Sequence, residues 1–401
     1  MVTNWALLIT SVYLVIYYIL LLVENRERRS EGESEPEVTI ALPAYNEADN
    51  IERALKSLAE LDYPPEKLHV IVVDDGSSDG TYEVAKRFAE RSRIDITVVR
   101  HEKNRGKGAA LNTAISLTET PYLVTMDADS YVDPGALRAM LRKAGTSDAV
   151  AACIFPDRVG GIAERVQEIE YLMSNYLAHI LSRFDAQLVT PGPFSLFRME
   201  VLRDLGGFDE NAPAEDLEIV FRMRKKGYKL DFAPDAHVYT EIPKDLRGLV
   251  KQRRRWKLGV FDTIEKHPHF LLPTTIFAEQ VFISFIFSVS VLVLFALTIY
   301  TLYKKLDKLY VFLRAVGLDI FPFLRNFELK FDIYYLDPQT LFYSLLGVVL
   351  TVILLTVMFN FFEGRKMGWK DFLLYVFLYP GALITAYLLA FKDWIKRDYR
   401  W

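Results

Sequence analysis

The chain of 401 residues has one cysteine, Cys153, and little net charge. A single cysteine excludes an intramolecular disulfide scaffold. A formal charge of -4 gives no general attraction for a polyanion, so we expect no nucleic-acid partner. Intrinsic disorder is excluded too, because 27 Phe, 22 Tyr and 5 Trp are far more than disordered chains carry. At about 150 residues per domain, the length suits two or three domains.

Two common nucleotide-binding motifs are also missing. No G-x-G-x-x-G opens the first expected helix, which argues against a dinucleotide-binding fold. The chain has no G-x-x-x-x-G-K-[ST] motif either, so residues 104–108 (NRGKG) are not a P-loop. Lys107 nevertheless lies between two glycines, where a lysine suits a phosphate neighbour.

Hydrophobic residues make up 51% of the chain and are concentrated in four uncharged runs. This segregation explains a positive mean hydropathy, +0.12, beside a charged fraction of 25%. The runs cover residues 5–23, 280–303, 338–362 and 372–391. Each is close to the roughly 20 residues that a helix needs to cross a bilayer. We therefore expect a multi-pass protein of the cell membrane with about four spans: an N-terminal anchor at 1–24 and a C-terminal transmembrane region at 273–401.

The charges beside these runs predict how the chain is oriented in the membrane. Arginines within residues 26–29 follow the first run and favour the cytoplasm, which places the soluble domain, residues 36–243, on that side. Strict alternation then puts the C-terminus outside. Lys392 and Lys396 favour the cytoplasm instead, so either the last run does not cross fully or the tail lies outside despite its charge.

Residues 36–243 alternate apolar runs with segments of helical periodicity. Strands are expected at 38–42, 68–73, 96–99 and 122–126. Continuous apolar strands alternating with helices predict an α/β fold with a parallel sheet covered by helices on both faces. Ligands of such sheets bind beyond the carboxyl ends of the strands, where the polar clusters of this sequence follow.

Two acidic clusters are candidates for chemistry. Asp127 and Asp129 follow the fourth strand, and carboxylates of this kind hold Mg²⁺ together with substrate phosphates, although Asp-x-Asp is also common in turns. Glu215 and Asp216 open a helix, where acids also simply complement the helix dipole. Asp75, after the second strand, suits either a helix-capping turn or a nucleobase N–H.

Residues 244–272 form a basic segment that includes Gln252-Arg-Arg-Arg-Trp256. Placed on a helix, its apolar residues share a face about 140° wide, at 100° per residue. A basic amphipathic helix of this kind predicts binding to a membrane surface. Arg253 and Lys257 fall inside the apolar arc, so we expect them to extend to the interface or to meet a ligand.

Six motifs in this order resemble those of the family 2 glycosyltransferases. They are Pro-Ala-Tyr-Asn-Glu, Asp-Asp-Gly-Ser-x-Asp-Gly-Thr, Asn-x-Gly-Lys-x-x-Ala-Leu-Asn, Asp-Ala-Asp, Glu-Asp and Gln-x-x-Arg-Trp. More narrowly, residues 36–262 resemble the membrane-embedded branch that includes cellulose, chitin, hyaluronan and poly-N-acetylglucosamine synthases. The resemblance implies a GT-A (Rossmann-like) fold and an inverting hexosyl transfer from a nucleotide sugar. A UDP-sugar is the favoured donor, and Mg²⁺ or Mn²⁺ the cofactor.

The resemblance also implies roles for single residues. Donor-binding residues would be Pro43, Tyr45, Glu47, Asp75, Lys107, Asp127, Ala128, Asp129, Gln252 and Arg255. Asp127 and Asp129 would bind the metal ion, and Asp216 would be the general base with Glu215 beside it. Trp256 would contact the acceptor. The chain departs from the family at Ala214, where threonine is usual, and at 190–195 (TPGPFS), where the family often has a Gly/Ser- or Cys-containing acceptor loop.

Three functions remain open from the sequence. The favoured one is a polysaccharide synthase that extends a glycan, with membrane lipids as further partners. Four spans are few for a channel that conducts a polymer through one protomer, so an oligomer is possible. The second is transfer of a single sugar to a lipid such as a polyprenyl phosphate. The third is a non-catalytic sensor of nucleotide sugars, which the presence of Asp216, Arg255 and Trp256 disfavours.

Overall fold

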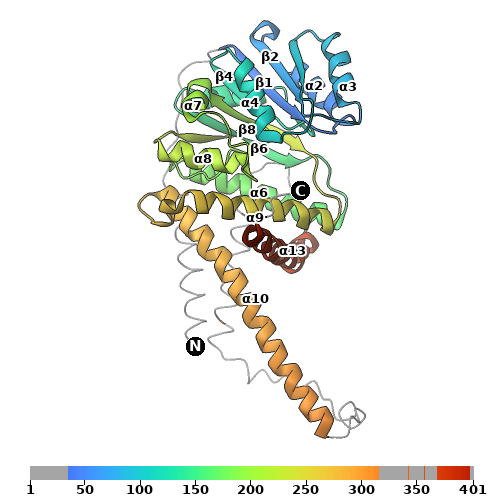
Figure 1. Ribbon diagram of the computed structural model, residues 1–401, viewed down its shortest axis with the longest axis vertical. Helices are drawn as coiled ribbons and strands as arrows, with labels where there is room; N and C mark the ends of the chain where they lie inside the picture. Colours follow the sequence, from blue (N-terminus) through green and yellow to red (C-terminus); the bar gives the residue numbers. More distant parts are fainter. Residues whose placement is uncertain (1–34, 316–341, 343–355, 357–367, 398–401) are drawn as a thin grey trace. The chain divides into compact units, whose positions relative to one another are not determined.

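The computed structural model describes residues 35–315, 342, 356 and 368–397 (Figure 1). These residues belong to two compact units, of which one contains residues 35–284 and 368–397. The other contains residues 285–315, 342 and 356. The predicted span at 5–23 lies outside the described residues, and so does the span at 338–362 except for two positions.

A single eight-stranded sheet forms the centre of the larger unit. Its strand order is β3(Asp95–Arg100), β2(Leu68–Asp74), β1(Val38–Ala44), β4(Tyr122–Thr125), β7(Ser195–Arg198), β6(Ala149–Pro156), β8(Leu230–Thr240) and β5(Ser130–Val132). β1 to β4 are parallel, as expected. β7 is antiparallel to β4 and β6, and β5 is antiparallel to β8. β6 and β8 pair in parallel, so the all-parallel expectation is wrong for β7 and β5 only, because an apolar run identifies a buried strand but not its direction.

Helices cover both faces of the sheet, as predicted (Figure 1). Successive residues of β1 point to opposite faces, so Ile40 and Leu42 enter one core while Ala41 enters the other. The first core is closed by α2(Ile51–Ala59), α3(Thr81–Ala89) and α5(Ala136–Ala144). The second is closed by α4(Lys107–Leu117), α7(Met199–Leu205) and α8(Glu215–Lys225).

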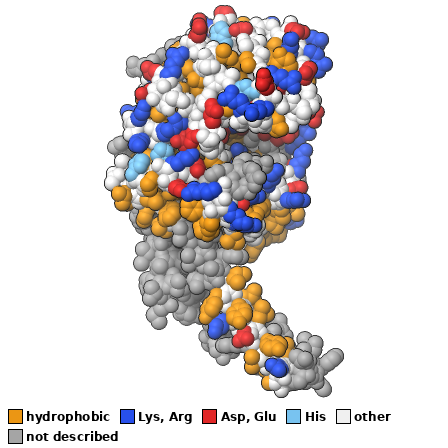
Figure 2. All heavy atoms as spheres, viewed as in Figure 1, with side chains coloured by type: hydrophobic (Ala, Val, Ile, Leu, Met, Phe, Trp, Pro, Cys, Tyr) orange, Lys and Arg blue, Asp and Glu red, His pale blue; other side chains and the backbone are white. Residues whose placement is uncertain are grey.

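Three long helices pack together beside the sheet. They are α6(Ile162–Ser182), α9(Leu246–Lys266) and α13(Trp369–Lys396), and α9 contacts both α8 and α13. α9 is the basic helix expected from the sequence, and it begins after Asp245, whose Oδ1 accepts a hydrogen bond from Gly248 N at 2.7 Å. Figure 2 shows hydrophobic side chains gathered along the edge of this unit where Figure 1 places α9 and α13.

The remaining elements are the short 3-10 helices η1(Pro65–Lys67) and η2(Pro268–Leu271) and the long helix α10(Ile276–Ala315), which contains the apolar run 280–303. Among the described residues, α13 is the one helix that passes as a membrane span by length and hydropathy. The prediction of about four spans thus stays a prediction.

Candidate active site

The site is organised around Lys107, the first residue of α4. Its Nζ lies 2.6 Å from Asp127 Oδ1, just beyond β4, and 3.1 Å from Glu215 Oε1 at the start of α8. Burial opposes the charge on Lys107, but Asp127 and Glu215 outweigh it and raise the lysine pKa. One ammonium thus joins three predicted site segments that are far apart in the sequence.

The pKa values of the two acids that open α8 are shifted in opposite directions. Burial opposes ionisation of Glu215, but Lys107 and then Arg255 lower its pKa below the usual value. Burial, followed by the charge of Glu215, raises the pKa of Asp216 to about 6. A neighbouring pair of carboxyl groups with pKa values pushed apart is a common basis for assigning a permanently charged group and a proton acceptor.

The backbone around Asp216 is held in place by a neighbouring loop. Thr190 Oγ1 donates to the Asp216 carbonyl at 3.0 Å, and Leu217 N donates to Asp216 Oδ1 at 2.9 Å. In the same loop, a side chain at Gly192 would collide with Lys107, since its Cβ would lie 2.3 Å from Lys107 Nζ and 3.1 Å from Asp127 Oδ2. The loop at 190–195 therefore approaches the Lys107–Asp127 ion pair closely.

A second group of carboxylates surrounds Asp129. Burial is the main cause that raises the pKa of Asp129 to about 7, and Asp127 and Glu47 add to it. Glu47 has a raised pKa as well, because of burial and the nearby Glu241 and Asp127. Glu241 N also donates to the Asp129 carbonyl at 3.3 Å.

Crowded carboxylates of this kind suit a hard divalent cation. The described residues contain no cluster of three or more His, Cys, Asp or Glu side chains arranged to hold a metal ion. Asp127 and Asp129 fit Mg²⁺ or Mn²⁺ in the way that keeps substrate phosphates as further ligands. The raised pKa of Asp129 supports this fit, since a cation would relieve the repulsion that Asp129 experiences from Asp127.

Asp75 organises the loop that carries Lys107. Its Oδ1 accepts from Arg105 N at 2.9 Å and lies 2.7 Å from His101 Nδ1, while its Oδ2 accepts from Gly106 N at 2.7 Å. His101 is held in turn by Thr113 Oγ1, 2.9 Å from its Nε2. The predicted contact between Asp75 and the donor stays a prediction, and the observed contacts give this residue a positioning role.

The remaining predicted donor residues lie at the carboxyl edge of the first strands. Pro43 is near the end of β1, Tyr45 follows it with a side chain 48% exposed, and Ala128 is buried between the two aspartates. Their positions agree with the rule that ligands bind beyond the carboxyl ends of parallel strands.

Helix α9 holds the predicted site residues Gln252, Arg255 and Trp256. Arg255 acts electrostatically on Glu215 and Asp216, whose pKa values it lowers. Gln252 instead accepts a hydrogen bond from Arg253. The Arg253 guanidinium lies 4.1 Å from the centre of the Trp256 ring, a cation–π contact that fixes the predicted acceptor residue.

The expectation is wrong for Arg253, whose side chain does not reach solvent, whereas for the partly exposed Lys257 it stays a prediction. Arg253 is 1% exposed and forms an ion pair with Glu170 of α6. The Lys257 ammonium lies 4.9 Å from the centre of the Tyr387 ring on α13. The acidic partner Glu170 lies in a helix that the sequence patterns did not identify, and a lone Glu in such a helix carries no signal of its own.

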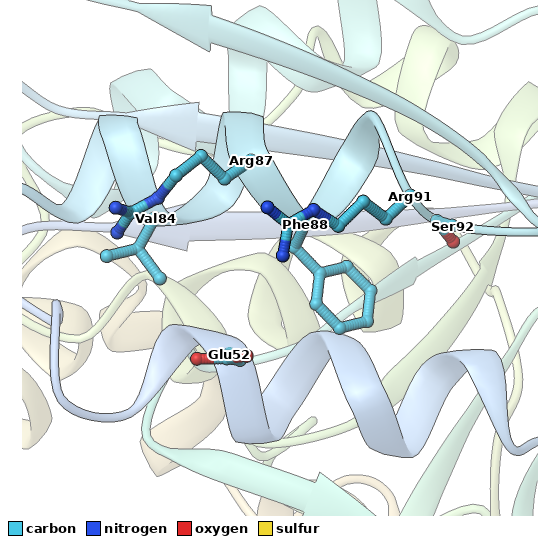
Figure 3. A pocket seen from close by; sticks show the side chains of 6 residues that line it. All are labelled: Glu52, Val84, Arg87, Phe88, Arg91 and Ser92. Atoms are coloured by element: carbon cyan, nitrogen blue, oxygen red, sulfur yellow. The ribbon is translucent and has the colours of Figure 1, made fainter.

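A hollow of about 400 Å³ lies elsewhere on the unit, between α2 and α3. Figure 3 shows Phe88 pointing from α3 toward α2, with Arg87 and Arg91 on the same helix and Glu52 opposite. None of its lining residues belongs to the predicted site.

The family follows from comparison with known proteins. Residues 39–206 match the family model described as glycosyl transferase family 2. The chain carries a family 2 glycosyltransferase domain. The resemblance to the family 2 glycosyltransferases is thereby confirmed for residues 39–206, which hold the first four of the six motifs.

Relatives of the family 2 domain include two named poly-beta-1,6-N-acetyl-D-glucosamine synthase. The chain is 30% identical to the Staphylococcus epidermidis protein over 244 residues, which are 60% of this chain and 57% of that protein. It is 30% identical to the Staphylococcus aureus (strain MSSA476) protein over 268 residues, with 63% and 64% covered. The chain thus spans 57% to 64% of the length of these two relatives.

Among solved structures, the chain is similar to a mannosyltransferase from Pyrobaculum calidifontis in complex with GDP-Man and Mn²⁺. The match has a TM-score of 0.64 and 21% identity, and it covers 98% of this chain and 99% of that one. This likeness confirms the GT-A fold that the resemblance implied, although the sheet is mixed rather than all parallel.

Proposed function

We propose that the protein is an inverting glycosyltransferase that moves a sugar from a nucleotide-sugar donor to a hydroxyl of a glycan or lipid acceptor at a membrane surface. The observation that carries the proposal is the cluster in which Lys107 joins Asp127 to Glu215, with the titratable Asp216 beside it. The cluster supplies cationic charge for a diphosphate and a base for a hydroxyl at one edge of the sheet.

Asp216 is the proposed general base. Its carboxylate accepts the proton of the acceptor hydroxyl while the acceptor oxygen bonds to the anomeric carbon of the donor sugar. The bond from that carbon to the diphosphate oxygen breaks, and the nucleoside diphosphate leaves with the electron pair. A single displacement of this kind inverts the configuration at the anomeric carbon. A pKa near 6 keeps Asp216 mostly ionised at neutral pH and still basic enough to take a proton.

The negative charge that develops on the leaving diphosphate is stabilised best by cations whose positions are fixed before the reaction. Lys107 and Arg255 are the proposed protein groups, because one is held between Asp127 and Glu215 and the other acts on the acids of α8. Asp127 and Asp129 would hold Mg²⁺ or Mn²⁺, which when bound supplies Lewis-acid stabilisation of the diphosphate. The presence of Mn²⁺ with GDP-Man in the Pyrobaculum structure is consistent with this proposal.

The substrate class follows from chemistry and relatives together. A base of raised pKa is useful for a hydroxyl acceptor, whereas an acceptor phosphate is already ionised at neutral pH. This favours extension of a glycan over transfer to a polyprenyl phosphate, as do relatives named as polysaccharide synthases. A UDP-sugar is the donor we propose first. A GDP-sugar is the second candidate, because the Pyrobaculum structure holds GDP-Man.

The test is incubation of the purified full chain with radiolabelled UDP- and GDP-sugars, with glycan oligomers or polyprenyl phosphate as acceptors. The proposal predicts labelled product from a UDP-sugar and a hydroxyl acceptor, with the anomeric configuration inverted by NMR. Product size separates a polymer from a single transferred sugar. Donor binding without any sugar transfer would contradict the proposal and favour a sensor.

A further inference from the structure

Both ends of helix α13 are bound to helices α6 and α9 of the sheet-containing unit, whose residues 35–284 we call the catalytic unit. At its start, Arg165 Nη1 of α6 lies 3.2 Å from Asp371 Oδ1. At its end, Asp393 forms an ion pair with Arg254 of α9, and Arg397 Nη1 donates to Glu265 Oε2 at 2.7 Å. Both ends of this helix therefore have partners on one compact unit.

The middle of α13 is held by the same unit. The Tyr379 hydroxyl donates to Glu170 Oε1 of α6, the carboxylate that also pairs with the buried Arg253. Toward the C-terminus, Ala386 and Ala390 are completely buried, in the part of α13 where Tyr387 meets the ammonium of Lys257 on α9. The helix lies along the catalytic unit over its whole length.

This arrangement conflicts with a membrane span. Asp371 and Asp393 are 22 residues apart (393 − 371), which at 1.5 Å per residue is about 33 Å of helix. A hydrocarbon core is roughly 30 Å thick, so a crossing helix would place the two aspartates on opposite sides of the bilayer. Their partners, Arg165 and Arg254, belong to one unit that cannot reach both sides.

The outward face of α13 is apolar. Leu373, Phe377, Leu388 and Ile395 are 40%, 78%, 39% and 62% exposed, and at 100° per residue they share an arc of roughly 60°. Three exposed lysines accompany this stripe: Lys370, Lys392 and Lys396. An apolar stripe flanked by lysines matches the boundary between acyl chains and anionic headgroups.

We propose that α13 does not cross the bilayer but lies in its cytoplasmic interface, with the stripe of Leu373, Phe377, Leu388 and Ile395 inserted among the lipids. Because the inner face of α13 packs against α9, this placement puts α9 and Trp256 next to the membrane surface. The placement also removes the conflict in the charge pattern, since Lys392 and Lys396 then stay on the cytoplasmic side. The proposal concerns membrane placement and holds whichever sugar the enzyme transfers.

The first test is the sidedness of the two ends of α13. Lys370→Cys and Lys396→Cys are made separately in the full chain carrying Cys153→Ala, with Lys86→Cys on α3 as the reference for the catalytic unit. A membrane-impermeant maleimide is applied to sealed right-side-out and inside-out vesicles. The proposal predicts that all three positions react in inside-out vesicles only. Reaction of Lys370→Cys and Lys396→Cys from opposite sides would overturn it.

The second test is the depth of the outward face. A fluorophore is attached at Phe377→Cys, Leu388→Cys or Ile395→Cys in reconstituted vesicles that contain lipids with quenchers at known depths. An interfacial helix predicts the same shallow depth at all three positions, about 5–10 Å below the headgroup boundary. A depth that reaches the bilayer centre at any position would overturn the proposal. Absence of quenching by lipid would do so as well, because it would mean that protein, such as a second copy of the chain, covers this face.

Discussion

Gly259 of α9 packs directly against Ala214, the residue that precedes the Glu215–Asp216 pair. A Cβ at position 259 would lie 2.3 Å from the Ala214 Cβ, so position 259 has no room for a side chain while the backbones stay in place. The distance between α9 and the proposed base is thus set by two small residues.

We predict that Gly259→Ala moves α9 away from Glu215 and Asp216. Overpacking of this kind costs about 1–3 kcal/mol, so the melting temperature should fall by several degrees and sugar transfer should fall with it. Ala214→Gly in the same chain removes the colliding methyl group and should restore much of both losses. Gly135→Ala is the matched control, because a Cβ there meets no atom within 4 Å. Equal effects of Gly259→Ala and Gly135→Ala would contradict this role for the contact.

The pH profile of transfer should report Asp216. Its pKa lies at about 6, above the usual range of an aspartate, so the carboxylate gains its proton and stops acting as a base as the pH falls through about 6. We expect the rate of transfer to a hydroxyl acceptor to be half-maximal near that pH, to decline below it and to level off around neutral pH. An ionised phosphate acceptor needs no base, so the rate of transfer to it should not show this decline. A hydroxyl-acceptor rate that stays unchanged well below that pKa would exclude Asp216 as the base.

The ion pair between Arg253 and Glu170 should contribute strongly to stability. Arg253→Met leaves Glu170 without its charged partner in a buried contact, which costs about 3–5 kcal/mol. At roughly 2–4 °C per kcal/mol, the melting temperature in detergent should fall by at least about 6 °C. Adding Glu170→Gln should recover part of the loss, whereas Arg247→Met, at an exposed site on the same helix, should change little. A single Arg253→Met variant as stable as the parent would show that the pair is not needed.

Removal of divalent metal should stop transfer. Chelation leaves Asp127 and Asp129 repelling one another and the donor diphosphate, so we expect activity to vanish and to return with Mn²⁺ or Mg²⁺. Asp127→Asn and Asp129→Asn should each weaken donor binding in the presence of metal. The exposed Asp235→Asn serves as the control acid. Full activity after chelation would contradict the proposed role of the two aspartates.

The sequence predicts the first half of the sheet well, because β1 to β4 are buried apolar runs separated by Gly- and Asp-rich turns. It does not predict β6 to β8, whose antiparallel and bulged pairings depend on contacts between residues far apart, such as the register shift between Ala152 and Cys153. The same limit applies to the site. Lys107, Asp127 and Glu215 come from motifs, whereas Glu241 and Glu170 have no local pattern and are identified only once β8 and α6 are in place.

The most direct test of the central claim separates donor binding from transfer in Asp216→Asn. Binding of a labelled nucleotide sugar and single-turnover transfer to a hydroxyl acceptor are measured on the same preparations of the parent and the variant. The amide keeps the size of the side chain but cannot take a proton, and general bases contribute about 10²–10⁴-fold. We predict donor affinity within a few-fold of the parent and a transfer rate lower by at least about 100-fold. Near-normal transfer by Asp216→Asn would contradict the assignment of this residue as the base.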